Sequence, residues 1–168
     1  MTVRVVLPAL ASMAVLASAS VWGASADERW TAYSKTAISI TGDVTFSPGR
    51  ITFGNGRYLP LAPAGSIPRY NALGKSVTAG LFRVTAPSDP VLLHGNRLCG
   101  GRTPQPVTFI VVSTVGPVPD GPELRSMDVF ADATPPNAEG GTQSCGTYNY
   151  EPAGATLIPA NPLGGTRP

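Results

Sequence analysis

Proline and glycine interrupt this chain so often that a helix-rich fold is not expected. The 168 residues include 18 Pro and 19 Gly, and in a helix interior Gly costs about 1 kcal/mol and Pro about 3 kcal/mol relative to Ala. The chain still has apolar residues for a core, because 42% of it is hydrophobic and only 13% is charged. This composition excludes a solvated, disordered chain and favours short strands.

Between these breakers, apolar residues recur at every second position, which is typical of strands with one buried face. The unbroken apolar run 107–115 predicts a fully buried central strand. The expected strands are 38–40, 44–46, 51–53, 77–86, 91–93, 107–115, 124–131 and 147–150. About eight short strands predict an all-β fold, a small antiparallel barrel or sandwich, and the barrel is favoured because closure removes exposed strand edges.

The N-terminus has the three parts of a secretory signal peptide. Arg4 supplies positive charge, residues 5–17 form an apolar stretch, and Ala24-Ser25-Ala26 is a small-residue cleavage site. We therefore expect a secreted or periplasmic protein with no membrane span after signal removal. The expected segments are a signal peptide (1–26), a flexible N-terminal segment (27–35), a single β domain (36–151) and a flexible tail rich in Pro and Gly (152–168).

The two cysteines, Cys99 and Cys145, are the only ones in the chain. Because an exported chain folds in an oxidising compartment, the sequence predicts one disulfide between them. In the chain-entropy model, closing a loop of this length stabilises the fold by about 4 kcal/mol. A redox-active pair is the alternative, but the chain has no Cys-x-x-Cys motif.

Charge is unevenly distributed along the chain. Residues 50–102 hold seven basic residues and one acid, whereas residues 103–168 hold two basic residues and six acids. These charges either neutralise one another across the barrel surface or give a basic side that attracts anionic glycans or lipid head groups. The net charge of +2, without interleaved aromatic residues, argues against nucleic acid as a partner.

The sequence predicts no catalytic, cofactor or metal site. His94 is the single histidine, and its position before Gly95 and Asn96 favours a turn residue. The chain has no Gly-x-Ser-x-Gly motif and no second histidine for a metal. Four acids are available for a glycosidase pair, but spacing alone selects none of them: Asp120, Glu123, Asp128 and Asp132. Enzymatic activity is therefore the least favoured of the functions considered for this sequence.

Two segments resemble known families. The stretch from Leu93 to Val112, followed by the late Cys145-Gly146-Thr147-Tyr148, resembles a group of small exported bacterial β-proteins without an assigned activity. This resemblance covers about residues 36–151 and implies an exported, noncatalytic β domain that binds a ligand or associates with the envelope. This resemblance does not identify the binding partner. An anionic envelope glycan is one class of candidate partner.

Residues 51–59 and 64–70 resemble the periplasmic C-type lysozyme inhibitors, in which a Ser-Gly-x-x-Tyr type loop enters the enzyme. The sequence departs from that motif at Ile67, which stands where the loop glycine is expected. The resemblance implies an alternative function, inhibition of a lysozyme-like hydrolase through a protruding loop. The partner-binding residues would be Gly65, Ser66, Arg69 and Tyr70.

Overall fold

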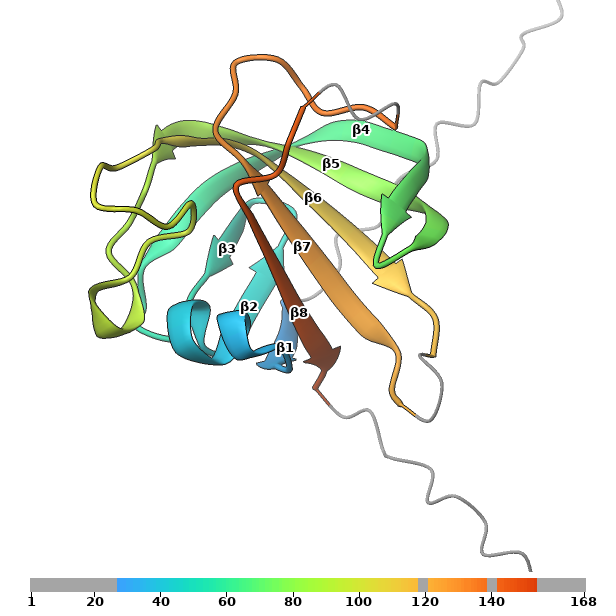
Figure 1. Cartoon of the computed structure of the whole chain (residues 1–168), viewed down its shortest axis with the longest axis horizontal. Coiled ribbons are helices and arrows are strands. Elements are labelled where there is room, and N and C mark those ends of the chain that lie inside the picture. The colour runs from blue at the N-terminus through green and yellow to red at the C-terminus, as the bar shows by residue number, and fades with distance from the viewer. Residues whose placement is uncertain (1–26, 118–120, 139–141, 154–168) are drawn as a thin grey trace, which may run out of the picture.

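The computed structural model describes residues 27–117, 121–138 and 142–153, and these residues form a closed antiparallel barrel (Figure 1). Each strand pairs with the next along the chain, and the last pairs with the first. The predicted all-β fold is confirmed, and the barrel is the correct alternative. The strands are β1 (Glu28–Ala32), β2 (Val44–Ser47), β3 (Arg50–Thr52), β4 (Tyr58–Ala72), β5 (Lys75–Ser88), β6 (Val107–Val115), β7 (Leu124–Phe130) and β8 (Gly146–Pro152).

Strand β1 corrects the prediction of a flexible segment over residues 27–35. Trp30 pairs with Val44 of β2 on one side and with Pro152 of β8 on the other. Its side chain is only 1% exposed, so this short strand both closes the barrel and fills its interior. The predicted signal peptide and the tail beyond residue 153 lie outside the described residues.

Two of the predicted strands are helical turns instead. Residues 38–40 belong to a single π-helical turn, η1 (Ala37–Thr41), and residues 91–93 run into a short 3₁₀ turn, η2 (Leu93–Gly95). Apolar patterns over only three positions fit either a strand or a helical turn. Ala37 is fully buried and packs with the barrel core, whereas Ile38 is 57% exposed.

The barrel interior holds the larger apolar cluster, to which all eight strands contribute. The Trp30 ring stacks on Phe46 at 4.8 Å between centroids, and the edge of Phe46 meets Phe82 at 5.2 Å. The buried Tyr150 hydroxyl bonds the Thr41 hydroxyl at 2.8 Å, which ties η1 to β8. Burying these rings removes a large apolar area from water and stabilises the closed barrel.

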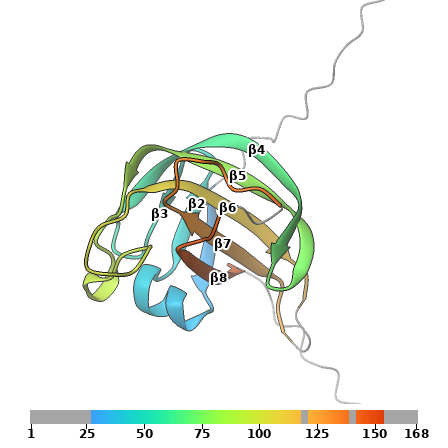
Figure 2. The same cartoon turned by 45° about the horizontal axis from the view of Figure 1, so that its top comes forward.

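A second apolar cluster lies on the outer face of β5, β6 and β7. In β6, Phe109 and Val111 belong to this outer cluster, whereas Ile110 between them belongs to the interior cluster. The distal part of the β4–β5 hairpin contributes Ile67 and Tyr70 to the outer cluster, and its bent end is visible in Figures 1 and 2. The predicted strand 107–115 is thus buried on both faces, as its composition requires.

Candidate functional site

The residues expected to form a protruding loop lie within β4. Gly65 and Ser66 pair with Leu81 and Gly80 of β5, so these residues form part of a strand and not the expected protruding loop. Two register irregularities in the β4–β5 pairing, between Pro63 and Gly65 and between Ile67 and Tyr70, occur where Pro63 and Pro68 stand in the strand. These irregularities bend the hairpin without ending it.

Three of the four predicted residues are exposed, and the fourth is not. Gly65, Ser66 and Arg69 face solvent, whereas Tyr70 is 9% exposed and belongs to the outer apolar cluster. A hydrolase inhibitor of the proposed type needs Tyr70 at an exposed tip. The buried Tyr70 does not meet that requirement.

Tyr70 instead bonds a buried carboxylate on β7. Its hydroxyl donates to Asp128 Oδ2 at 2.8 Å, and the Thr147 hydroxyl of β8 donates to Asp128 Oδ1. Burial, followed by the negative charge of Asp128, raises the pKa of Tyr70 far above its ordinary value. The tyrosine therefore stays protonated and holds the hairpin end against β7 as a hydrogen-bond donor.

A cleft opens beside this contact, between the hairpin end and the β7–β8 loop. Its volume is about 260 Å³, close to the lower end of the range for small-molecule sites. Among the described residues, the lining combines aromatic and apolar side chains with amide and hydroxyl groups, and none of these lining side chains is charged. The lining residues are Tyr70, Asn71, Phe130, Pro136, Asn137, Ala138, Thr142, Gln143 and Ser144. We call this the hairpin–loop cleft.

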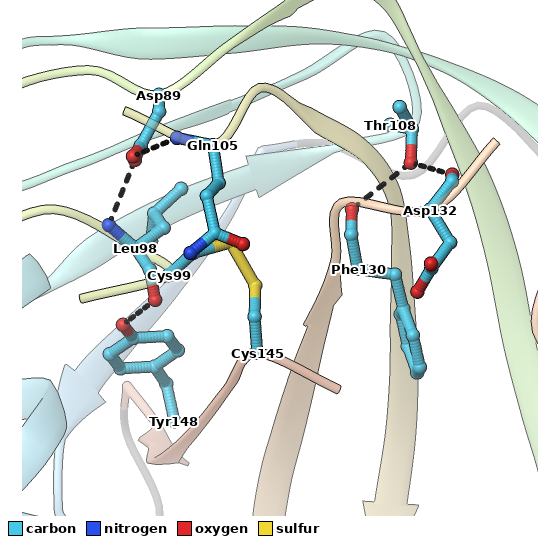
Figure 3. Close-up of a disulfide and its surroundings, with 9 residues drawn as sticks. All are labelled: Asp89, Leu98, Cys99, Gln105, Thr108, Phe130, Asp132, Cys145 and Tyr148. Atoms are coloured by element: carbon cyan, nitrogen blue, oxygen red, sulfur yellow. Dashed lines mark hydrogen bonds between the residues drawn. A yellow bond between two sulfur atoms is a disulfide. The ribbon is translucent and has the colours of Figure 1, made fainter. Parts of the chain in front are cut away.

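The disulfide anchors the loop side of the cleft (Figure 3). Cys99 and Cys145 are joined, with their Cα atoms 4.7 Å apart, which confirms the predicted pairing. The Cys145 backbone N–H donates to the Val129 carbonyl at 2.8 Å. The next residue, Gly146, passes so close to the β5–β6 loop that a Cβ atom there would lie 2.5 Å from the Leu98 carbonyl oxygen. Residues 142–144, which line the cleft, are therefore followed directly by a segment that the disulfide and this close contact hold in place.

Asp89 orders the loop that carries Cys99 (Figure 3). One carboxylate oxygen accepts from the Leu98 N–H at 3.1 Å, and the other accepts from the Gln105 N–H at 3.0 Å. The Tyr148 hydroxyl donates to the Leu98 carbonyl at 2.6 Å. These bonds hold the long β5–β6 connection, whose one regular element is the short turn η2, against β8.

Tyr148 gives the fold a pH dependence. Burial, and then the charge of Asp89, raises the pKa of Tyr148 to about 12, above the value of about 10 in an unfolded chain. Because the folded state favours the protonated form, its contribution to stability is complete below about pH 10 and is lost as the pH rises toward 12. We expect Tyr148→Phe to lose stability less steeply than the wild type between pH 9 and 11.5 in urea denaturation. Equal slopes would contradict this expectation.

The basic residues between 50 and 102 have no acidic partners in the described part of the chain. Both ion pairs found there involve Arg125, which binds Glu28 at 3.0 Å and Glu123 at 2.7 Å. Arg69, next to the cleft residue Tyr70, is exposed and forms no ion pair with any described acid. Arg83 lies over the Phe109 ring at 5.9 Å. This distribution leaves positive charge available on the hairpin side.

The candidate catalytic groups are scattered. His94 is an exposed turn residue with φ 55°, as predicted. Glu123 and Asp132 lie just beyond opposite ends of β7, and both Asp128 oxygens accept hydrogen bonds; Asp120 lies outside the described residues. Within the described ranges, no three His, Cys, Asp or Glu side chains gather where they could hold a metal ion. Nor does any helix in those ranges have the length and apolar character needed to cross a membrane.

Comparison of this chain with protein-family models, with curated proteins and with solved structures finds no match. The candidate site therefore depends on the chain's own geometry. The sequence indicates Tyr70 as a partner-binding residue and Asp128 only as one of four candidate glycosidase acids, and it predicts neither their hydrogen bond nor a cleft beside the β7–β8 loop. Cys145 is the sequence feature that could have indicated this loop, because a disulfide at the end of a long polar loop holds the loop in one position on the surface.

Proposed function

We propose that this chain is an exported, noncatalytic barrel domain that binds an anionic envelope glycan in the hairpin–loop cleft. The observation that carries the proposal is the composition of the cleft lining, which includes the side-chain amides of Asn71 and Gln143 together with Tyr70 and Phe130. Amides both donate and accept hydrogen bonds, as sugar hydroxyls require. The rings of Tyr70 and Phe130, which are 9% and 2% exposed, form the apolar part of the cleft wall.

Arg69 supports the anionic character of the ligand. It directly precedes two lining residues, Tyr70 and Asn71, and its side chain is exposed. An exposed guanidinium presents a fixed fork of donors that matches a carboxylate or phosphate group. A glycan that carries acidic groups would therefore place its hydroxyls in the cleft and one acidic group against Arg69.

Two observations support export. The first 26 residues have a signal-peptide pattern, and the only two cysteines are paired, as in proteins of oxidising compartments. A noncatalytic role agrees with the position of Asp128. Both of its oxygens accept hydrogen bonds from protein hydroxyls, whereas glycoside hydrolysis usually needs two carboxylates facing the sugar.

Binding can be tested with an acidic oligosaccharide, such as an oligogalacturonate, and a neutral oligosaccharide of equal length. We expect calorimetric titration to detect binding of the acidic chain. Asn71→Ala and Gln143→Ala should each weaken it about tenfold, since a lost hydrogen bond to a ligand is worth about 1 to 1.5 kcal/mol. Arg69→Gln should weaken binding of the acidic chain more than binding of the neutral one, and added salt should reduce that difference.

Arg50→Gln is the matched control, because Arg50 is an exposed arginine on β3 and does not line the cleft. It should leave both affinities unchanged. The proposal fails if the acidic chain does not bind at millimolar concentration, or if it binds equally well to the Asn71→Ala and Gln143→Ala variants.

A further inference from the structure

Two buried serines and one half-buried asparagine share one cross-strand row on the outer face of β6, β7 and β8. Ser113 lies opposite Ser126, and Ser126 lies opposite Asn149. The hydroxyl oxygens of both serines and the Asn149 Oδ1 atom are shielded from solvent, and none has a hydrogen-bond partner among the described residues. Ser113 is 2% exposed and Ser126 is 1% exposed. Buried polar atoms are nearly always hydrogen-bonded, so three together require an explanation.

The row also contains unusually small side chains. The β5–β6 register pairs Gly80 with Val112, and continuing it by one residue puts Ala79 beside Ser113. Ala79 is itself buried, at 1% exposure. The neighbouring rows hold larger residues, Val111 with Asp128 on one side and Val115 with Leu124 on the other. The row thus holds smaller side chains than the two rows beside it.

The chemistry of the row matches water better than a cation. Two hydroxyls can donate or accept, and the amide oxygen accepts, so ordered water can bond each of these groups. A hard cation takes six to eight oxygen ligands, usually with carboxylates. The nearest carboxylate along β7 is Asp128, and both of its oxygens already accept bonds from Tyr70 and Thr147.

We propose that Ser113, Ser126 and Asn149 form a buried hydration site, in which ordered water bridges the two hydroxyls and the amide oxygen. Such water is a structural component, because each molecule satisfies several buried groups and is costly to remove. Within the row, Ser126 lies two residues along β7 from Asp128, the hydrogen-bond partner of Tyr70. It does not depend on the glycan proposal.

The sign of a stability change tests this proposal. We expect Ser113→Ala and Ser126→Ala each to lower the urea midpoint of unfolding, because each removes one partner of the bound water. In a dry row, the same changes would remove an unsatisfied hydroxyl and would raise the midpoint or leave it unchanged. Ser76→Ala is the control, since Ser76 is an exposed serine of β5, and it should not move the midpoint.

A direct measurement complements the variants. Nuclear Overhauser effects between long-lived water and the backbone amides of Ser113, Ser126 and Asn149 should be observed in the folded protein. Their absence, or raised or unchanged midpoints in both serine variants, would overturn the proposal. A wild-type midpoint that changes between sodium, potassium and calcium salts at constant ionic strength would also overturn it, in favour of a bound cation.

Discussion

Trp30→Ala is expected to lower the free energy of unfolding by about 3 to 5 kcal/mol, the usual cost of removing a large buried aromatic side chain. The Trp30 ring is 1% exposed, stacks on Phe46, and lies 5.8 Å from the Tyr150 ring. Its removal leaves a cavity where the first strand meets the last. Chemical denaturation of the variant and the wild type measures the difference.

Tyr33→Ala is the matched control for this change. Tyr33 is an aromatic residue just beyond the same strand, but its side chain is 46% exposed. Its replacement should shift the free energy of unfolding by less than about 0.5 kcal/mol. Equal effects of the two substitutions would mean that β1 does not close the barrel.

Removal of the disulfide is the second change with a large expected effect. Replacing both Cys99 and Cys145 by Ser should lower the free energy of unfolding by about 4 kcal/mol in the chain-entropy model, because the unfolded chain loses a cross-link. The sulfurs join positions 46 residues apart. Denaturation of the wild type with and without reductant should give the same difference as the double variant.

The double variant also serves as the control for any effect of the reductant other than reduction of the disulfide. Its unfolding midpoint should not respond to reductant, since the sequence contains no other cysteine. If the oxidised wild type and the double variant unfolded at the same denaturant concentration, the disulfide would be dispensable. The loop held by Asp89 would then be fixed by its hydrogen bonds alone.

Sequence patterns predicted the strands whose residues are buried on both faces or alternate over several positions. The bounds of β6 coincide with the predicted run 107–115, because β-branched and apolar residues fill both of its faces. Strand β4 was missed because Pro60, Pro63 and Pro68 are strand-breaking signals. Strand β1 was missed because it is five residues long and Trp30 is its one fully buried residue.

The sequence predicts only those parts of the candidate site that a residue type or a local motif indicates by itself. The cysteine count was sufficient for the disulfide, and Tyr70 was named from a local resemblance. The Tyr70–Asp128 bond joins residues 58 positions apart, and no local pattern specifies such a contact. The cleft likewise depends on how far the hairpin bends, which follows from register irregularities that single-sequence periodicity does not reveal.

Closure of the barrel through β1 and β8 determines the order in which the chain can fold. Neighbouring strands from β4 to β7 can pair soon after they are made, because each contact is local in sequence. Trp30, in contrast, meets Pro152, so the final seam forms only when nearly the whole described chain is available. Contacts between distant residues slow folding. Until that seam forms, the edges of β1 and β8 remain open to pairing with other chains, and slow synthesis or release of the C-terminal strand would prolong this vulnerable interval.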